Sequence, residues 1–238
     1  MTGYSRIFEN NFGLPYLENL FCMIVVIDGP SGSGKSSTAK AVASATGFKF
    51  LDSGAFYRIA TLIYREVSHK RDVFFERLKR ADIKVRQEKS EQQFILDGSD
   101  VSKTIRGREV TAMVSQVAAD PEVRDAVTAK LRQIVAQDDF IADGRDLGTV
   151  VFPDAKLKFF MIADLEVRAL RRFQEMQRLG LDADLNEIRS NLAERDHIDS
   201  NRAAAPLKKA AGAIEIDTSA LSFDDQVQMV VSHINQIE

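Results

Sequence analysis

The segment 29–36 is the first part of the chain whose residue types and spacing suggest chemistry, and it reads GPSGSGKS. It fits the pattern G-x-x-x-x-G-K-[ST] of a phosphate-binding loop, and we call it the P-loop. In such a loop backbone N–H groups converge on a phosphate, while the lysine and the next hydroxyl serve the β- and γ-phosphates and Mg²⁺. We therefore expect Lys35 to act in catalysis and Ser36 to bind Mg²⁺. The expected ATP-binding residues here are Gly29, Pro30, Ser31, Gly32, Ser33, Gly34, Lys35, Ser36 and Ser37.

The elements that must position this loop lie on either side of it. Residues 24–27 read IVVI, which predicts a buried strand, and residues 36–46 predict a helix that stops at Gly47. A loop between a strand and a helix places the phosphates at the helix N-terminus, where the helix dipole favours anions. The segment therefore predicts the binding of a nucleoside triphosphate.

Phosphate-binding loops occur in switches, motors and small-molecule kinases, so the loop alone does not name a reaction. A GTPase switch is disfavoured, because the sequence contains no Asn-Lys pair to begin a guanine-reading motif. A kinase needs a second phosphate site, and arginines suit it because their planar fork matches phosphate oxygens. Arginines that follow predicted strands, or that lie in a lid, would supply this second site.

Two such arginines follow predicted strands. Arg58 comes shortly after the predicted strand 48–52, at the edge where open α/β sheets bind their ligands. Arg145 follows a short apolar strand that ends at Asp143. The Asp143 carboxylate lies where it could join the Mg²⁺ shell, directly or through a water molecule.

A third group of arginines lies between residues 168 and 202. Arg195, Asp199 and Arg202 are spaced i, i+4 and i+7, which places them on one stripe of a helix if the helix continues that far. Spacing alone leaves it open whether this stripe binds a ligand or faces solvent. Arg178 and Arg189 are expected to be solvated surface residues.

The net charge and composition of the chain narrow the kinds of molecule that it is expected to bind. The 238 residues carry a net charge of -3, which disfavours DNA and RNA as partners. The single cysteine, Cys22, suits a reducing compartment, and no apolar run approaches the roughly 20 residues needed to cross a bilayer. We expect a cytoplasmic protein, a monomer without nucleic-acid or membrane partners. Residues 1–22 show no clean periodicity and are expected to be a loose extension or the result of a start codon placed too early.

The predicted elements alternate along the chain in a pattern typical of α/β proteins. Helices are expected at 107–119 and 122–136, strands at 156–162 and 213–217, and a final helix capped by Ser222. This alternation predicts a P-loop NTPase-type parallel sheet flanked by helices. Residues 82–105 read instead as short alternating strands with a turn at Asp97-Gly98, which predicts a small antiparallel insert.

Five sequence blocks together carry a resemblance to a known family. They read IDGPSGSGKSSTAKAVA, LDSGAFYR, SQVAADPEVR, IADGRDLGTVVFPDA and ERDHIDSNRAAAPL. In combination they are similar to bacterial-type cytidylate kinases, P-loop nucleoside monophosphate kinases that phosphorylate CMP and dCMP. The resemblance runs from about residue 23 to the C-terminus, and the last two blocks are far more restrictive than the P-loop.

The resemblance implies a domain plan and a set of substrates. It implies one domain over 23–238, with a core of 23–81 and 106–238, an NMP-binding insert at about 82–105 and a helical lid at about 168–203. ATP would be the phosphoryl donor, with Mg²⁺, and CMP or dCMP the acceptor. The transfer would be direct and in line.

The resemblance also implies roles for single residues. Arg58, Arg145 and Arg195 would ring the CMP phosphate and act in catalysis beside Lys35. Asp199 and Arg202 would hold the ribose, while Arg171 and Arg172 would close over ATP. The implied CMP-binding residues are Ser53, Tyr57, Arg58, Ser115, Arg124, Arg145, Asp146, Arg195, Asp199 and Arg202.

Three of these residues would read the base. An Asp146 carboxylate can accept from the amino group of cytosine, and Arg124 or Ser115 can donate to its O2 and N3. Uracil has a carbonyl in place of the amino group, so UMP is expected to bind less well.

Two other interpretations stay open at this point. The protein could be a kinase for another small acceptor, such as AMP or shikimate. It could also be a regulator or binding module whose P-loop only senses ATP, although the many arginines on the acceptor side argue against this.

Overall fold

The computed structural model describes residues 22–88, 91–135 and 138–237, so the predicted extension lies outside the described residues except for Cys22. A parallel five-stranded sheet forms its centre, in the order β2-β6-β1-β7-β8, with β1 in the middle. This confirms the predicted parallel α/β sheet. The strands are β1 (Ile24–Asp28), β2 (Lys49–Asp52), β6 (Phe140–Gly144), β7 (Leu157–Ile162) and β8 (Ile214–Asp217).

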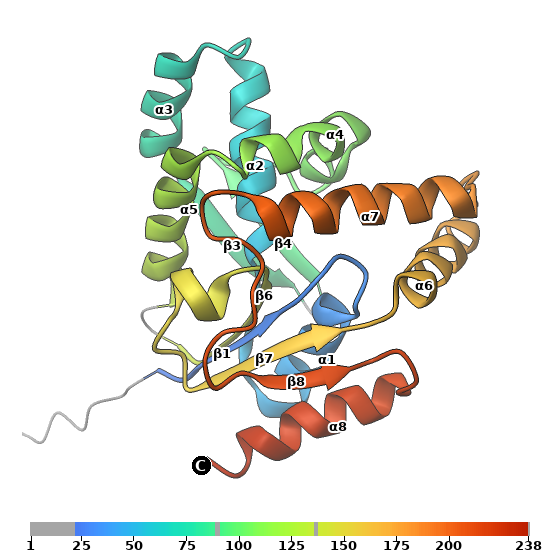
Figure 1. Ribbon diagram of the computed structural model, residues 1–238. Helices are drawn as coiled ribbons and strands as arrows, with labels where there is room; N and C mark the ends of the chain where they lie inside the picture. Colours follow the sequence, from blue (N-terminus) through green and yellow to red (C-terminus); the bar gives the residue numbers. More distant parts are fainter. Residues whose placement is uncertain (1–21, 89–90, 136–137, 238) are drawn as a thin grey trace, which may run out of the picture.

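Helices cover both faces of this sheet (Figure 1). Along β1, Val25 and Ile27 pack into an apolar cluster with α1 and α8, whereas Val26 packs on the opposite face with α2 and α5. Successive side chains of a strand point to opposite faces, so a strand buried on both faces is apolar throughout. The helices are α1 (Lys35–Thr46), α2 (Ser53–Glu66), α3 (Arg71–Arg80), α4 (Arg108–Val117), α5 (Pro121–Ile134), α6 (Leu165–Arg178), α7 (Leu185–Asn201) and α8 (Phe223–Ile234).

Helix boundaries agree with the predicted stops and caps in several places. Gly47 follows α1 with a φ of 81°, a left-handed conformation that glycine adopts without strain. Ser222 caps α8 by accepting from the backbone N–H of Asp225. The helix expected from 122 begins one residue earlier, at Pro121, because proline suits the first helical position. Its expected end at 136 lies outside the described residues.

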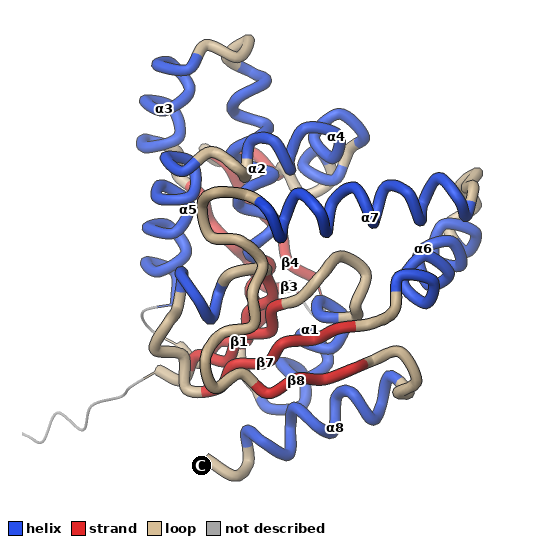
Figure 2. The backbone as a smooth tube through the Cα atoms, in the orientation of Figure 1, coloured by secondary structure: helices blue, strands red, loops and turns tan. Residues whose placement is uncertain are grey.

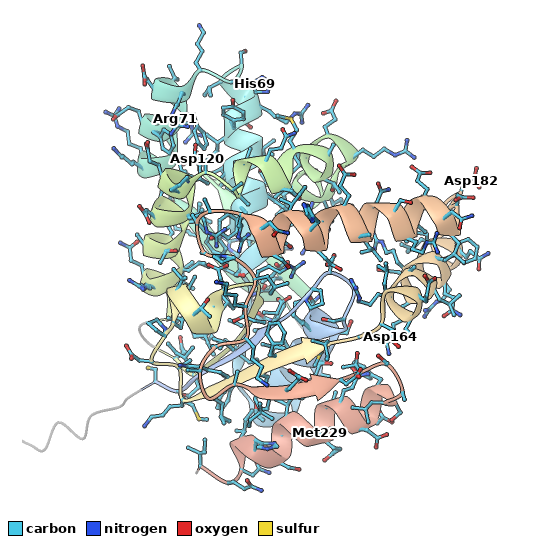
Figure 3. All side chains as sticks on the ribbon, viewed as in Figure 1. His69, Arg71, Asp120, Asp164, Asp182 and Met229 are labelled. Atoms are coloured by element: carbon cyan, nitrogen blue, oxygen red, sulfur yellow. The ribbon has the colours of Figure 1, made fainter. Side chains whose placement is uncertain are left out.

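Helix α3 is an element that the sequence patterns do not predict. Arg71 at its start forms ion pairs with Asp120 and Glu122 at the start of α5, and Figure 3 labels the first two of these residues. Phe74 and Leu78 are its buried residues. Two buried side chains among many charged ones give only a weak helical periodicity in the sequence. The helix is therefore stabilised mainly by its packing against α2 and α5.

The region 82–105 contains a separate antiparallel sheet in the order β3-β4-β5. Asp97 and Gly98 join β4 to β5 with φ values of 48° and 86°, which confirms the predicted turn. The division of the chain into core and insert stays a prediction. The strands are β3 (Ile83–Glu88), β4 (Glu91–Leu96) and β5 (Ser99–Asp100). Figure 2 draws strands in red and labels β3 and β4.

Helices α6 and α7 fill the region predicted as a lid and pack on each other. Their shared apolar cluster contains Ala169, Ile188 and Leu192. Figure 3 labels Asp164 just before α6 and Asp182 between the two helices. Arg202 is the C-terminal cap of α7, so the predicted helical stripe continues to Asp199 and ends just before Arg202. The boundaries of a lid at about 168–203 stay a prediction.

In the part of the chain that the structure describes, no helix combines the length and the apolar character needed to cross a membrane.

Candidate active site

The P-loop follows β1 and leads into α1, in the predicted order of strand, loop and helix. A Cβ atom at Gly29 would lie 2.0 Å from the carbonyl oxygen of Met161, so this position accepts no side chain. Lys35 is buried, and its Nζ donates to the carbonyl of Pro30 at 2.6 Å. Burial, together with the positive charge of Arg145, lowers the pKa of Lys35 well below its usual value. A bound phosphate would therefore stabilise the charged ammonium.

The two predicted magnesium ligands lie together. Ser36 Oγ donates to Asp143 Oδ2 at 2.5 Å, and Asp143 Oδ1 is buried without a hydrogen-bond partner among the described residues. Burial raises the pKa of Asp143 to about 6, and the negative charge of Asp52 contributes to the rise. A buried carboxylate oxygen without a partner, beside a hydroxyl, fits Mg²⁺, which uses one or two protein oxygens together with substrate phosphates. Across the described ranges, no cluster of three or more His, Cys, Asp or Glu side chains could hold a metal ion.

The predicted acceptor side is a chain of alternating charges. Arg124 pairs with one oxygen of Asp146, and Arg202 Nη2 donates to the other at 3.2 Å. Arg202 Nη1 also lies 3.4 Å from Asp199 Oδ1, and Asp199 Oδ2 accepts from Arg145 Nε at 2.9 Å. The side chains of Arg124, Asp146 and Arg202 are each about 95% buried, with exposed fractions of 5%, 5% and 6%. The fold thus unites five of the predicted CMP-binding residues, which come from α5, from the turn after β6 and from the end of α7.

Two donors beside this chain of charges have no partner. The Tyr57 hydroxyl and Arg124 Nε are buried and lack hydrogen bonds among the described residues. The Arg124 guanidinium lies 5.0 Å from the centre of the Tyr57 ring. Burial, with the negative charge of Asp146, raises the pKa of Tyr57 to about 12, so its hydroxyl stays a neutral donor. Buried donors normally have partners, and a ligand with acceptor atoms would supply them here.

Arg58 and Arg195 approach the same region from different helices. Arg58, on α2, donates to the carbonyl of Ile105 at 3.2 Å. Arg195, on α7, lies 3.3 Å from the Oγ of Ser31 in the P-loop. Burial and then the positive charge of Arg145 lower the pKa of Arg195 to about 10, and Arg58 adds to this effect. Burial also lowers the pKa of Arg58, where Asp52 opposes and Arg145 reinforces the shift. Three arginines that destabilise one another's charges form a place where an anion is favoured.

Four predicted residues make no hydrogen bond or ion pair with these charged residues in the described part of the chain, although the positive charge of Arg172 helps to lower the pKa of Arg58. Ser53 Oγ donates to the carbonyl of Asp143 at 2.7 Å, so it supports the end of β6. Ser115 is half-buried on α4 and its side chain makes no hydrogen bond within the described residues. Arg171 donates to Thr218 Oγ1 at 3.0 Å, whereas Arg172 pairs with Glu175 in solvent. Neither Arg171 nor Arg172 makes a hydrogen bond with the P-loop within the described residues.

Asp28 is a site residue that the sequence analysis missed. Its two carboxylate oxygens accept from the backbone N–H groups of Leu147 and Gly148, at 2.9 and 2.7 Å. Asp28 therefore ties the end of β1, directly before the P-loop, to the turn that carries Arg145 and Asp146. The only sequence signal was a carboxylate at the end of an apolar strand.

A family model described as cytidylate kinase matches residues 25–236 of the chain. The chain belongs to the cytidylate kinase family. It is 41% identical to a cytidylate kinase from Lactobacillus gasseri over 221 residues, which cover 91% of this chain and 94% of the relative. It is 44% identical to a cytidylate kinase from Paraburkholderia xenovorans over 211 residues, or 87% and 91% of the two chains.

Membership of the cytidylate kinase family confirms the resemblance read from the five sequence blocks and makes the protein a nucleoside monophosphate kinase. A solved structure of an uncharacterized protein from Eubacterium ventriosum matches 90% of this chain and 98% of its own, with a TM-score of 0.50 and 14% identity. At that identity the likeness concerns the fold alone. Because the family consists of kinases, its membership disagrees with the alternative interpretation of the protein as a regulator that only senses ATP.

Proposed function

We propose that the protein transfers the γ-phosphoryl group of ATP to CMP and dCMP, which gives ADP with CDP or dCDP. The observation that carries the proposal is the chain of charges from Arg124 to Arg145, in which Arg145 and Asp199 lie near enough to Lys35 of the P-loop to influence its pKa. Relatives of the chain over nine-tenths of its length are named cytidylate kinases, which supports the choice of acceptor.

Catalysis then rests on alignment and on charge. The P-loop and Lys35 hold the β- and γ-phosphates, while Arg58, Arg145 and Arg195 hold the acceptor phosphate in line with them. These groups neutralise the charge that develops as the phosphoryl group moves, and no covalent intermediate on the protein is needed.

Ser36 and Asp143 are the residues that would hold Mg²⁺, since the unpartnered Asp143 Oδ1 lies beside the hydroxyl that begins α1. When bound, the ion neutralises phosphate charge. The protein's own contribution here is a buried carboxylate close to the P-loop.

The base would be read next to Asp146. Cytosine presents one amino donor, which suits a carboxylate, and two acceptors, which suit the free donors of Arg124 and Tyr57. Ser115 is a third candidate reader. UMP lacks the amino group, so it would leave the Asp146 carboxylate facing a carbonyl.

The test is ADP release from Mg-ATP with CMP, dCMP, UMP, AMP, GMP or shikimate as acceptor. We expect CMP and dCMP to stimulate release well above UMP. Stimulation by AMP or shikimate instead would keep the kinase and reject the base-reading residues. No stimulation by any acceptor would reject the proposed reaction. A cytoplasmic location and a monomeric state stay predictions, and size-exclusion chromatography with light scattering tests the second.

A further inference from the structure

Arg168 is a buried arginine for which the proposed chemistry has no role. It lies in the first turn of α6 and its side chain is 7% exposed. Its Nε donates to the carbonyl of Ala163 at 2.8 Å, and its Nη1 donates to the carbonyl of Ser31 at 3.0 Å and to Asp196 Oδ2 at 2.7 Å. One side chain thus joins the start of α6, the P-loop and α7.

Asp196 completes the link from the side of α7. Its second oxygen, Oδ1, accepts from the backbone N–H of Ser31 at 3.4 Å. The preceding residue, Arg195, donates to Ser31 Oγ at 3.3 Å. Ser31 therefore forms hydrogen bonds with side chains of both α6 and α7 through its N–H, its carbonyl and its hydroxyl. A Cβ atom at Gly32 would lie 3.3 Å from Arg168 Cβ, so the P-loop also packs against the arginine stem.

Apolar packing does not fix α7 on the sheet in the same way. In the described part of the chain, neither of the two large apolar clusters around the sheet includes a residue of α6 or α7. The cluster of Ala169, Ile188 and Leu192 holds the two helices to each other. Polar contacts at Ser31 therefore have a large share in setting where α7 lies relative to the P-loop.

We propose that Arg168 and Asp196 are positioning residues that hold α7 against the P-loop and so aim Arg195 at the acceptor phosphate. The inference rests on the proposed function. Its physical basis is that a displacement of about 1 Å in a phosphate-binding group can cost up to about 100-fold in rate. Without the pair, α7 keeps its packing on α6 and the ion pair of Asp199 with Arg145, but it loses the contacts that fix its middle against the backbone of Ser31.

Asp196→Asn tests the proposal, because it keeps the shape of the side chain and removes the charge that pairs with Arg168. We expect kcat for CMP to fall by about tenfold or more, while the dissociation constants of ATP and CMP change by less than about threefold. Arg168→Lys is the second variant and is expected to lower kcat in the same way, because the compact ammonium of lysine lacks the planar fork with which Arg168 reaches Ala163, Ser31 and Asp196. Melting temperatures establish that each variant is folded at the assay temperature.

Arg189→Ala is the matched control, since Arg189 also joins α7 to α6 through Glu166, but in solvent. We expect this variant to stay within about twofold of the wild type. Asp196→Asn in an Arg195→Ala background is expected to add less than about twofold, because the group that it positions is already gone.

An active wild type with Asp196→Asn within twofold of it would overturn the inference and leave the reaction standing. An equal loss from Asp196→Asn with and without Arg195 would also overturn it, because the effect would then not pass through Arg195. A wild type without CMP-dependent ADP release would reject the proposed reaction, and the inference with it.

Discussion

The polar side chains of the site are of two kinds. Some are charged groups that pair with one another, and others have a polar atom without a hydrogen-bond partner among the described residues. Asp146 pairs with both Arg124 and Arg202, whereas Tyr57, Arg124 and Asp143 each keep one buried polar atom without a partner among the described residues. Buried polar atoms without partners are rare in folded proteins. Their presence next to the P-loop and next to the charge chain points to the two ends of a bound substrate pair.

Lys35→Met tests the donor side. The change keeps most of the side-chain length and removes the cation, so we expect kcat to fall by about 10²–10³-fold in steady-state assays of ADP release. Lys40→Met, at an exposed position of the same helix, is the control and is expected to retain wild-type kcat. A Lys35→Met variant with normal kcat would contradict the assignment of the phosphate site.

Asp146→Asn tests the base-reading side. Replacement by alanine would leave the buried Arg124 guanidinium without a carboxylate and Arg202 with only its longer contact to Asp199, a loss of about 3–5 kcal/mol in the free energy of unfolding. Asparagine also loses the charge but keeps the volume and one acceptor oxygen for the guanidinium groups, so we expect a smaller loss of stability and a folded variant whose kcat/KM ratio of CMP over UMP is about tenfold smaller. The ratio is measured with both acceptors under one condition, and an unchanged ratio would show that another group reads the base.

At the level of elements, the small antiparallel sheet is attached to the main sheet through Gln92. Its Nε2 donates to the carbonyl of Phe50, and its Oε1 accepts from the N–H of Asp52 at 3.1 Å. Asp52 is also the N-cap of α2, which carries Ser53, Tyr57 and Arg58. The positions of the small antiparallel sheet and of α2 therefore both depend on the end of β2.

Gln92→Ala is expected to raise the KM for CMP several-fold and to leave the KM for ATP unchanged, because it detaches the insert from β2 and not from the P-loop. It also leaves two buried backbone groups without partners, which costs about 1–3 kcal/mol of folding stability. Gln87→Ala is the matched control, since Gln87 lies directly across from Gln92 on β3 but is exposed. Equal KM changes for both nucleotides would contradict a role confined to the acceptor side.

For the molecule as a whole, the free energy of folding depends on the charge of Asp28. Burial raises the pKa of this carboxyl to about 6 in the folded state, from an ordinary value of 3.8. Between these values the folded state holds a proton that the unfolded state has released, so stability falls as the pH rises through the window. The loss is on the order of 3 kcal/mol.

The side chain at position 28 cannot titrate in the Asp28→Asn variant, so this variant is expected not to lose folding stability through Asp28 as the pH rises. Urea unfolding of both proteins at several pH values from 4 to 7 measures the effect. The stability of the wild type relative to the variant is expected to decrease as the pH rises to about 6 and to level off above it. Parallel pH curves for the two proteins would contradict the raised pKa.

Much of the architecture could be predicted from the sequence because its signals are local. The P-loop, the Gly47 stop, the Asp97-Gly98 turn and the parallel strands each depend on residue types within a few positions of one another. Backbone sterics and burial act at that range, so periodicity and turn residues are sufficient. The sequence blocks also led to the cytidylate kinase family, which the comparison with known proteins confirmed.

The pairing of charges was decided only by the tertiary structure. Asp28 meets Gly148 across 120 positions, Arg168 meets Asp196 across 28, and Arg202 meets Asp146 across 56. Asp146 and Asp196 each had many arginines available and Asp28 many backbone N–H groups, and spacing does not distinguish among them. Burial does, because a desolvated charge requires a partner at hydrogen-bonding distance, and only the packed sheet and helices determine which partner lies there.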